Sequence, residues 1–268
     1  MRGFFTSCRF SAYNCQKGGA LRRFVKYNVC CSAFAVLEDD AAERSVRSIC
    51  DRYTGVGTSG AVIVRQNPFR ARIFRADGRE IPFDASSLAC AAAYLCEKCG
   101  TPKISMITGG EICEAEILPT GEVCISLPKI KAESLRFRRA DVSRPIEYVK
   151  LSVGAAMRAV CPVDDIYGAI LFGQGEALSK YLSGALTYDI DLARLRNDGL
   201  LEVRSYERGS GYVASALGAY AAAYVLNALG KCGGDVRVKT DSGKMMVSLA
   251  KKPTAKMTVS KILSGEIY

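Results

Sequence analysis

The sequence of 268 residues contains no histidine. This absence excludes serine–histidine triads, histidine general bases and histidine metal ligands. A zinc site made of cysteine alone would need a second suitably spaced pair besides Cys96 and Cys99. The other close pair, Cys30 and Cys31, does not have this spacing, because the two residues are consecutive in the sequence. We therefore expect no metal. We also expect the twelve cysteines to be free thiols in a reducing compartment, the cytoplasm.

Acidic residues are missing from the start of the chain, where the first one is Glu38. Six of the basic residues behind the net charge of +10 precede it, and the rest of the chain is only mildly basic. Nucleic-acid binding would rest on this short arm, and we do not expect it. Residues 1–23 also lack the long apolar core of a secretory signal. They remain open as a disordered tail, an organelle transit peptide or the product of a start codon placed too early.

One pattern occurs twice at half the chain length: a strand, a glycine-containing turn, a nearly uncharged alanine-rich helix and a hairpin. The copies are offset by about 130 residues, which predicts two similar domains. The first copy comprises the strand and turn 72–78, the helix 85–99 and the hairpin 104–117, and the second comprises the octet 204–211, the helix 212–230 and the hairpin 236–250.

Neither predicted helix has a polar face, so each must be buried on all sides. The 212–230 segment is long enough to span a bilayer, but Gly218 and Asn227 lower its hydrophobicity and no aromatic or basic belts flank it. We therefore expect a buried helix and no membrane association. Because the start of a helix can hold an anion, the two turns predict a ligand site in a cleft between the domains.

Several segments of the sequence resemble the corresponding segments of the diaminopimelate epimerase family. The most specific is Tyr-Glu-Arg-Gly-Ser-Gly at 206–211, directly before the second alanine-rich helix. Asp-Arg-Tyr-Thr-Gly-Val-Gly at 51–57 and Ser-Gly-Glu-Ile at 264–267 add to the resemblance, which covers about residues 24–268. It implies an α/β (α+β) fold of two pseudo-symmetric domains, each a sheet around a central helix. The N-terminal domain would comprise 24–133 with a short final strand over 259–268 that returns to it, and the C-terminal domain would comprise 134–258.

The resemblance also implies a cofactor-independent reaction at the two helix starts. In the family, one cysteine thiolate removes the substrate α-proton and a second cysteine returns a proton to the opposite face. In this sequence the first cysteine position falls on Asp84 and the second on Ala216. Ala216 can neither accept nor give a proton. Asp84 has two interpretations. It is either the N-cap of its helix or a base that acts on one face of the substrate, and the N-cap is favoured.

Most substrate-holding positions of the family have changed as well. Ser32 lies in a loop that is Gly-Asn-Asp in the family, Arg75 replaces an asparagine, and Asp-Ile-Asp at 189–191 replaces an Asn-Ile-Gly motif. Gly154 to Met157 replaces Gly-Asn-Pro-His. Glu207 and Arg208 alone are retained. The predicted substrate-binding residues are Glu207, Arg208, Arg75, Ser86, Ser87 and Ser32.

Three functions stay open. The first is an epimerase-like protein without two-cysteine activity that binds a small carboxylate, an amino acid or another protein in the cleft, as a homodimer or paired with an active paralogue. The second is an isomerase of another small acid, with Asp84 as base and Arg208 and Arg75 as anchors. The third is a genuine diaminopimelate epimerase of lysine biosynthesis. The alternative for Arg75 is an ion pair with Asp77 or Glu207 in place of a ligand contact.

Overall fold

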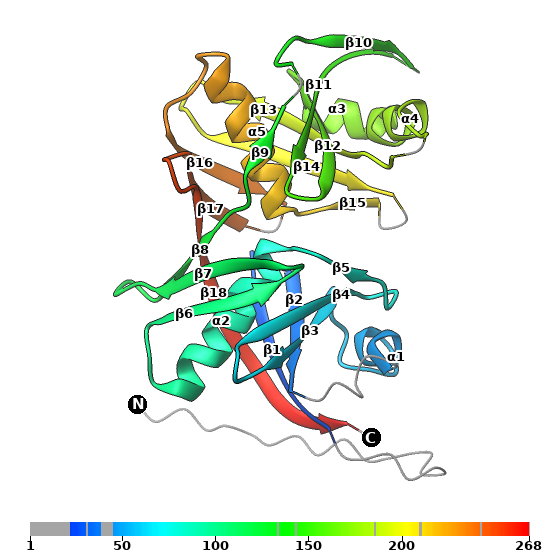
Figure 1. Cartoon of the computed structure of the whole chain (residues 1–268). Coiled ribbons are helices and arrows are strands. Elements are labelled where there is room, and N and C mark those ends of the chain that lie inside the picture. Colours follow the sequence, from blue (N-terminus) through cyan, green and yellow to red (C-terminus); the bar gives the residue numbers. More distant parts are fainter. Residues whose placement is uncertain are drawn as a thin grey trace.

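The computed structural model of the chain describes residues 22–30, 32–38, 45–132, 134–142, 144–184, 186–208, 211–241 and 243–267. Two halves meet at the middle of the molecule, and each surrounds one long helix with strands (Figure 1). This mixed α+β, strand-rich architecture confirms the predicted fold class.

The N-terminal half forms a closed ring of strands around its central helix. The ladder runs through β1, β2, β3, β4, β6, β7 and β8, and it closes because β18 pairs with both β8 and β1. The elements are β1 (Arg22–Val29), β2 (Ser32–Leu37), α1 (Val46–Cys50), β3 (Gly60–Arg65), β4 (Arg70–Arg75), β5 (Glu80–Ile81), α2 (Ala85–Cys99), β6 (Lys103–Thr108), β7 (Glu111–Ile117) and β8 (Glu122–Ser126).

The C-terminal half repeats the same succession of ladders. The pairings β11–β12, β13–β14 and β16–β17 are antiparallel, whereas β12–β13 and β14–β16 are parallel, as in the first half. The elements are β9 (Ile130–Lys131), β10 (Arg138–Asp141), β11 (Pro145–Val153), β12 (Ala156–Pro162), α3 (Ile166–Leu171), α4 (Gln174–Tyr181), β13 (Asp189–Leu195), β14 (Leu201–Glu207), β15 (Gly211–Val213), α5 (Ala216–Ala228), β16 (Asp235–Thr240) and β17 (Gly243–Ser248).

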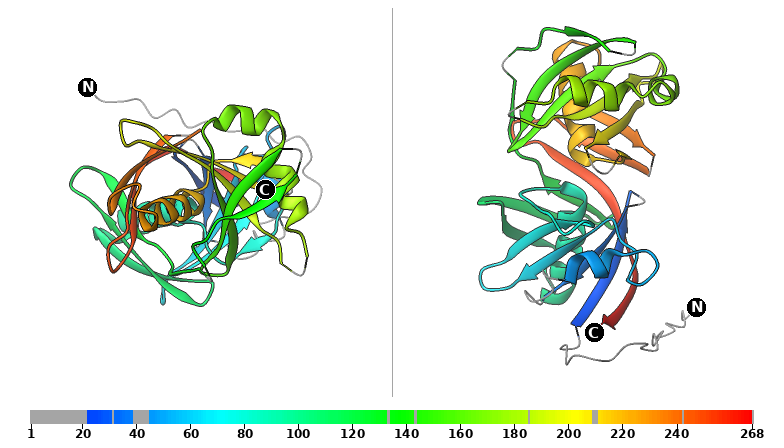
Figure 2. Two further views of the ribbon diagram at one scale, coloured as in Figure 1. Left: turned by 90° about the horizontal axis from the view of Figure 1, so that it is seen from above. Right: turned by 90° about the vertical axis from the view of Figure 1, so that its right-hand side faces the viewer.

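The last strand, β18 (Thr254–Ile267), belongs to both halves. Its start pairs with β17 and β8, and its later part pairs with β1. In the right-hand view of Figure 2 it runs from the upper half along the lower one. The prediction of a short strand over 259–268 was wrong at its start, because the ladders to β8 and β17 extend the strand back to Thr254. The domain boundaries themselves remain a prediction, although β1 starts at Arg22, inside the expected extension 1–23.

Both central helices begin at the junction of the halves and run away from it (Figure 1). The prediction for α2 is confirmed, because Asp84 caps its start and Gly100 adopts a left-handed conformation at its end, with φ of 64°. The prediction of a helix over 212–230 was too long. Its first residues form β15, because Tyr212 and Val213 pair with β14, and α5 starts only after the cap Ser215.

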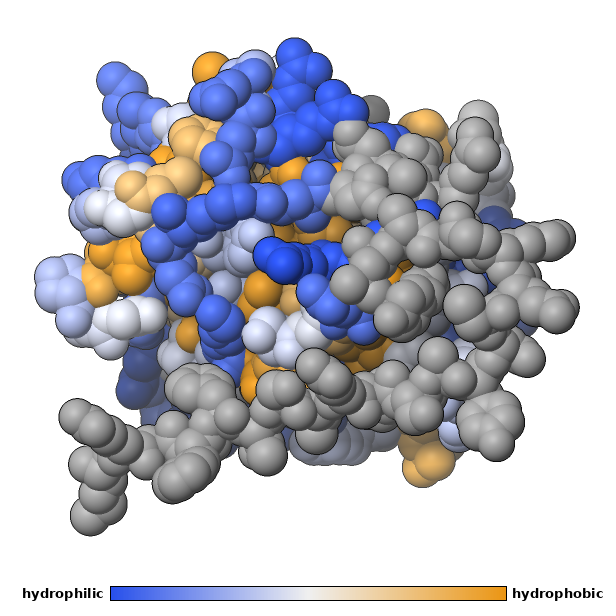
Figure 3. Space-filling view, turned by 90° about the horizontal axis from the view of Figure 1, so that it is seen from below, coloured by the Kyte–Doolittle hydropathy of each residue, from blue (hydrophilic) through white to orange (hydrophobic). Residues whose placement is uncertain are grey.

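The two helices share one hydrophobic core. Ala85 and Leu88 of α2 belong to the same buried cluster as Ala216 and Leu217 of α5, so the core is continuous across the junction. Within the described ranges, no helix combines the length and apolar character that a membrane span requires. On the face seen from below, hydrophilic residues separate smaller groups of hydrophobic ones (Figure 3). Residues 1–21, which include most of the expected extension, lie outside the described residues.

Candidate functional site

The site predicted at the two helix starts is built from two N-caps. Oδ2 of Asp84 accepts a hydrogen bond from the backbone N–H of Ser87 at 2.7 Å. In the same way, Oγ of Ser215 accepts from the backbone N–H of Gly218 at 3.2 Å. Both caps have an extended backbone, as the residue before a helix normally does. The two helices therefore start with the same local geometry and different capping groups.

The first turn of α2 carries the polar groups on the N-terminal side. Asp84 is half-buried, and Ser86 and Ser87 are buried. The Ser87 hydroxyl donates to the backbone oxygen of Asp84 at 3.0 Å, so it closes the helix start from the other direction. Asp84 thus has the favoured N-cap role, and its role as a base stays a prediction.

The start of α5 offers no titratable group of its own. Ala216 is its first residue and is 1% exposed. The cysteine of α2 closest in sequence to Asp84 is Cys90, which is fully buried. Burial raises the pKa of the Cys90 thiol well above its ordinary value, and the charge of Asp84 adds to this effect. A buried thiol that stays protonated is a poor base, so Cys90 serves as a core residue.

Arg75 and Glu207 form an ion pair that joins the halves. Arg75 ends β4 and Glu207 ends β14, which are equivalent strands of the repeat, and Nη1 of Arg75 donates to Oε2 of Glu207. Their side chains are 21% and 13% exposed, so water screens the pair only in part. Of the two partners that the sequence offered, the structure selects Glu207. Two predicted substrate anchors therefore neutralise each other.

A buried network that the sequence analysis missed lies behind α5. Nε and Nη2 of Arg158 each donate to the Asp191 carboxylate at 2.7 Å, and Nη2 also reaches Oγ of Ser215 at 3.3 Å. Ser205 donates to Asp191 at 2.6 Å, and Arg158 lies 3.4 Å from Asp189. Burial alone lowers the pKa of Arg158, but its contacts with Asp191 outweigh burial and raise it. Arg158 thus supports the α5 cap from inside the protein.

Gly218 explains how this network fits under the helix. A Cβ atom at this position would collide with Oγ of Ser205 and Oδ1 of Asp191, and it would lie 3.0 Å from Nη2 of Arg158. The absence of a side chain therefore lets α5 lie directly on the charged cluster. One signal was available in the sequence, since Asp189 and Asp191 alternate along one strand and must share a face.

The negative charges of the carboxylates in this region are only partly balanced by nearby guanidinium groups. Burial raises the pKa of Glu207, and Asp189 adds to the effect, whereas Arg75 and Arg158 oppose it. Burial also raises the pKa of Asp189; Arg158 opposes this shift, and Asp191 adds to it. The interacting charged groups are Asp84, Asp189, Asp191 and Glu207 on one side and Arg75, Arg79 and Arg158 on the other. Among these interacting groups, carboxylates outnumber guanidiniums by four to three.

The two remaining predicted residues make different contacts. Nη1 of Arg208 donates to Oγ of Ser183 at 3.3 Å, beyond the end of α4, and the side chain is exposed. Ser32 is the first residue of β2 and pairs with Val29 of β1. The structure therefore assembles Asp84, Glu207 and Arg75 with the first turn of α2, and it records no contact of Arg208 or Ser32 with them among the described residues. Their role in binding stays a prediction.

Comparison with known proteins agrees with this geometry. The chain is 26% identical to the diaminopimelate epimerase of Pseudomonas syringae pv. tomato over 219 residues, which cover 75% of this chain and 79% of the relative. It is 25% identical to the diaminopimelate epimerase of Caldanaerobacter subterraneus subsp. tengcongensis, over 91% of this chain and 99% of the relative. The predicted resemblance to the diaminopimelate epimerase family is therefore confirmed. No family model matches the chain.

The fold of this chain is also similar to that of more distant structures. A hydroxyproline epimerase from Agrobacterium vitis, solved with bound trans-4-OH-L-proline, superimposes with a TM-score of 0.72 over 92% of each chain at 11% identity. At that identity the likeness concerns the fold alone. In the described ranges of this chain, no group of three or more cysteine or acidic side chains is arranged to hold a metal ion.

Proposed function

We propose that this protein is a catalytically silent member of the epimerase family that acts by binding. The observation that carries the proposal is Ala216, a buried methyl group at the start of α5. Inversion at a carbon needs a proton acceptor on one face and a proton donor on the other. Ala216 supplies neither, and the nearby carboxylates Asp191 and Glu207 are bound to Arg158 and Arg75.

The charge of the site favours a ligand that carries an amine. A simple dicarboxylate would enter a region where carboxylates already outnumber guanidiniums, and like charges repel. An ammonium group near Glu207 and Asp189 would compensate the excess negative charge. Of the ligands expected from the sequence, an amino acid therefore fits better than a small carboxylate without an amine. A protein partner remains the alternative occupant.

Solvent-exchange measurements test the lack of activity. The purified chain is incubated with diaminopimelate in heavy water, and a cysteine-bearing diaminopimelate epimerase serves as the positive control. We expect α-deuterium to appear in the control only. Incorporation by this chain at a rate comparable with the control would overturn the proposal and favour a genuine epimerase.

A thermal-shift screen tests the binding role. Ligands that bind only the folded state raise its melting temperature. Amino acids and diamines should raise it, dicarboxylates of the same length should not, and Glu207→Gln should weaken the response. Larger shifts with the dicarboxylates would contradict the predicted charge preference.

A one-base isomerase is the second candidate, and Asp84 favours it. One carboxylate oxygen of Asp84 holds the helix cap, and no hydrogen bond to the other oxygen is recorded among the described residues. Asp84→Asn separates the roles, because asparagine caps a helix about as well as aspartate but cannot remove a proton. If a screened acid exchanges its proton with solvent, this variant should stop the exchange. Unchanged exchange in Asp84→Asn would remove this candidate.

A further inference from the structure

One strand at the outer end of the C-terminal half is paired along one side only. β10 (Arg138–Asp141) forms an antiparallel ladder with β11, and no second ladder to it is recorded among the described residues. Figures 1 and 2 place this strand at the end of the molecule that lies away from the N-terminal half. None of the residues at the two helix starts belongs to it. A role for this edge is therefore independent of the proposed ligand site.

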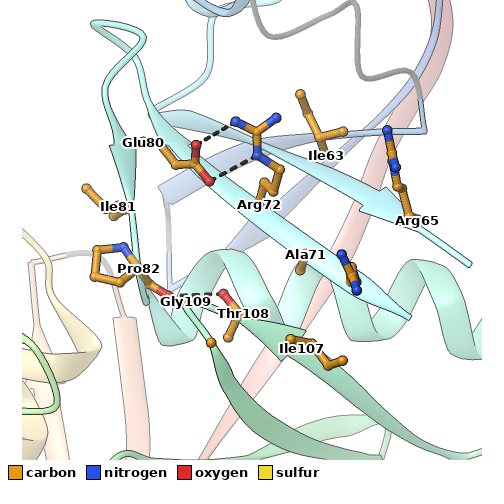
Figure 4. A pocket seen from close by; sticks show the side chains of 12 residues that line it. Ile63, Arg65, Ala71, Arg72, Glu80, Ile81, Pro82, Ile107, Thr108 and Gly109 are labelled. Atoms are coloured by element: carbon orange, nitrogen blue, oxygen red, sulfur yellow. Dashed lines mark hydrogen bonds and ion pairs between the residues drawn. The ribbon is translucent and has the colours of Figure 1, made fainter. Parts of the chain in front are cut away.

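Three other strands are paired along one side in the described ranges, and they are shorter. β5 and β9 have two residues each and β15 has three, against four in β10. The end of β5 is also covered. The Thr108 hydroxyl donates to the backbone oxygen of Pro82 at 3.0 Å (Figure 4), and a Cβ atom at Gly109 would lie 2.5 Å from that oxygen. The turn after β6 therefore packs tightly against the residues that follow β5, whereas β10 offers a longer edge.

The packing of the β10–β11 hairpin holds this edge in position. Ala140, Ile146 and Tyr148 are buried in one hydrophobic cluster that also contains residues of α3 and α4. Beside the turn of the hairpin, the guanidinium of Arg144 lies 3.3 Å from the centre of the Phe172 ring, directly after α3. A cation over an aromatic face is an attractive contact. An edge that is already ordered loses little conformational entropy when it pairs with another strand.

The exposed face of β10 carries one charge of each sign. Arg139 and Asp141 are exposed and share a face, because they flank the buried Ala140 in a strand whose side chains alternate. Nε of Arg139 donates to Oδ1 of Asp141 at 3.1 Å, which uses one of the five N–H donors of the guanidinium. Edge strands that carry charge of a single sign repel a second copy of themselves. The exposed face of β10 instead combines both signs and can complement itself.

Two-fold symmetry limits how two copies of β10 can pair. Antiparallel strands from identical chains are related by an axis perpendicular to the sheet, so directly opposite side chains lie on the same face. With the axis at Ala140, Arg139 lies opposite Asp141 of the partner subunit, and the same pair recurs on the other side of the axis. With the axis at Arg139 or at Asp141, two identical charges lie opposite each other. Unlike charges stabilise a ladder and like charges destabilise it, so the charges select the register centred on Ala140.

We propose that this chain forms a homodimer in which β10 pairs antiparallel with β10 of a second copy, in the register centred on Ala140. Backbone hydrogen bonds along the two edges would provide affinity, as they do wherever a strand is added to a sheet. The two pairs of Arg139 with Asp141 would fix the register and the choice of partner. Because β10 lies away from the helix starts, the ligand site of each copy would remain outside the interface (Figure 1).

Analytical ultracentrifugation of the full chain at rising concentration tests the association. An interface built on one short strand is small, so we expect a weak, reversible monomer–dimer equilibrium. The fraction of dimer should increase with protein concentration. A monomer at every concentration would overturn the proposal.

Charge reversal tests the register. Arg139→Asp and Asp141→Arg should each weaken dimerisation about tenfold or more, because each places like charges opposite one another on both sides of the axis. An equimolar mixture of the two variants should dimerise again, since every reversed side chain then faces the opposite charge. Single variants that dimerise like the parent, or a mixture that associates no better than its components, would contradict the register.

A matched variant controls for the change in net charge. Arg23 is an exposed arginine in β1 of the N-terminal half, where its Nε lies 3.2 Å from Oε1 of Glu266. Arg23→Asp alters the net charge as Arg139→Asp does, and it should dimerise like the parent. Circular dichroism verifies that all variants are folded. An equal loss of dimer in Arg23→Asp and Arg139→Asp would refute the assignment to β10.

Discussion

The two central helices are capped at their starts by chemically different groups. The start of α2 is capped by the charged, half-buried Asp84. The start of α5 is capped by the neutral Ser215, and the charges lie one layer deeper, in the buried pair of Arg158 and Asp191. Capping requires only an oxygen that accepts a backbone N–H. The two copies of the repeat therefore share the backbone geometry of the cap. They differ in where the charged groups lie: at the cap itself in α2, and in the buried layer beneath the cap in α5.

The largest effect is expected from breaking the buried charges. Arg158→Met leaves Asp191 buried without its guanidinium, which should reduce the free energy of unfolding by about 3–5 kcal/mol. Urea denaturation measures the loss. Arg72→Met, which breaks an exposed pair in the N-terminal half, should lose about 1 kcal/mol or less.

A double variant sharpens this comparison. Replacing both Arg158 and Asp191 with apolar residues removes the unpaired charge, so it should recover part of the stability lost in Arg158→Met. A loss in Arg158→Met no larger than in Arg72→Met would contradict the view that the C-terminal half depends on its buried pair.

The two caps should contribute less, and similarly to each other. Asp84→Ala and Ser215→Ala should each lower the free energy of unfolding by about 1 kcal/mol, because each leaves a backbone N–H without its acceptor. Asp84→Ser should remain within about 0.5 kcal/mol of the parent, since serine is also a good cap. If Asp84→Ser were as unstable as Asp84→Ala, the charge of Asp84 rather than its capping oxygen would matter.

The smallest effect concerns pH, and the halves should respond with opposite sign. In the folded C-terminal half the pKa of Asp189 is raised above its ordinary value of 3.8, mainly by burial. Asp189 therefore favours folding at low pH, and this contribution is lost as the pH rises through its folded-state pKa. In the N-terminal half, hydrogen bonds from the backbone of Thr54 and Tyr53 lower the pKa of Asp51. Asp51 therefore favours folding above its ordinary pKa.

Thermal melts between pH 3 and pH 7 test these signs. Relative to the parent, Asp189→Asn should gain stability as the pH rises, and Asp51→Asn should lose it. Parallel curves for the two variants would refute the predicted difference between the halves.

Much of the fold could be predicted because its signals are local. Asp84 and Gly100 mark the ends of α2 in the sequence, and the glycine-containing turns mark both predicted hairpins. The start of α5 was misplaced because Tyr212 and Val213 belong to the same uncharged run as the helix, and only their pairing with β14 shows that they form a strand. The start of β18 was missed for the same reason, since its partners lie far away in the chain.

The candidate site was predictable only in part. The repeat and the family resemblance pointed to Asp84, Ala216 and Glu207, and the ion pair of Arg75 with Glu207 was one of two possibilities. The partnership of Arg158 with Asp191 was not foreseen, because a charged residue in a strand usually faces solvent. Its burial follows from the packing of α5 over β12 and β13, which Gly218 permits.

The sequence by itself determined the presence of two buried helices, the capping oxygen of Asp84 and the missing proton donor at Ala216, because each depends on the residues present at one place in the chain. The tertiary structure alone decided which charges meet. Arg75 and Glu207 are 132 residues apart, and Arg158 and Asp191 are 33 apart. An ion pair needs its two groups within a few ångströms of each other in a partly dehydrated space, and only the packed halves create that distance and that burial.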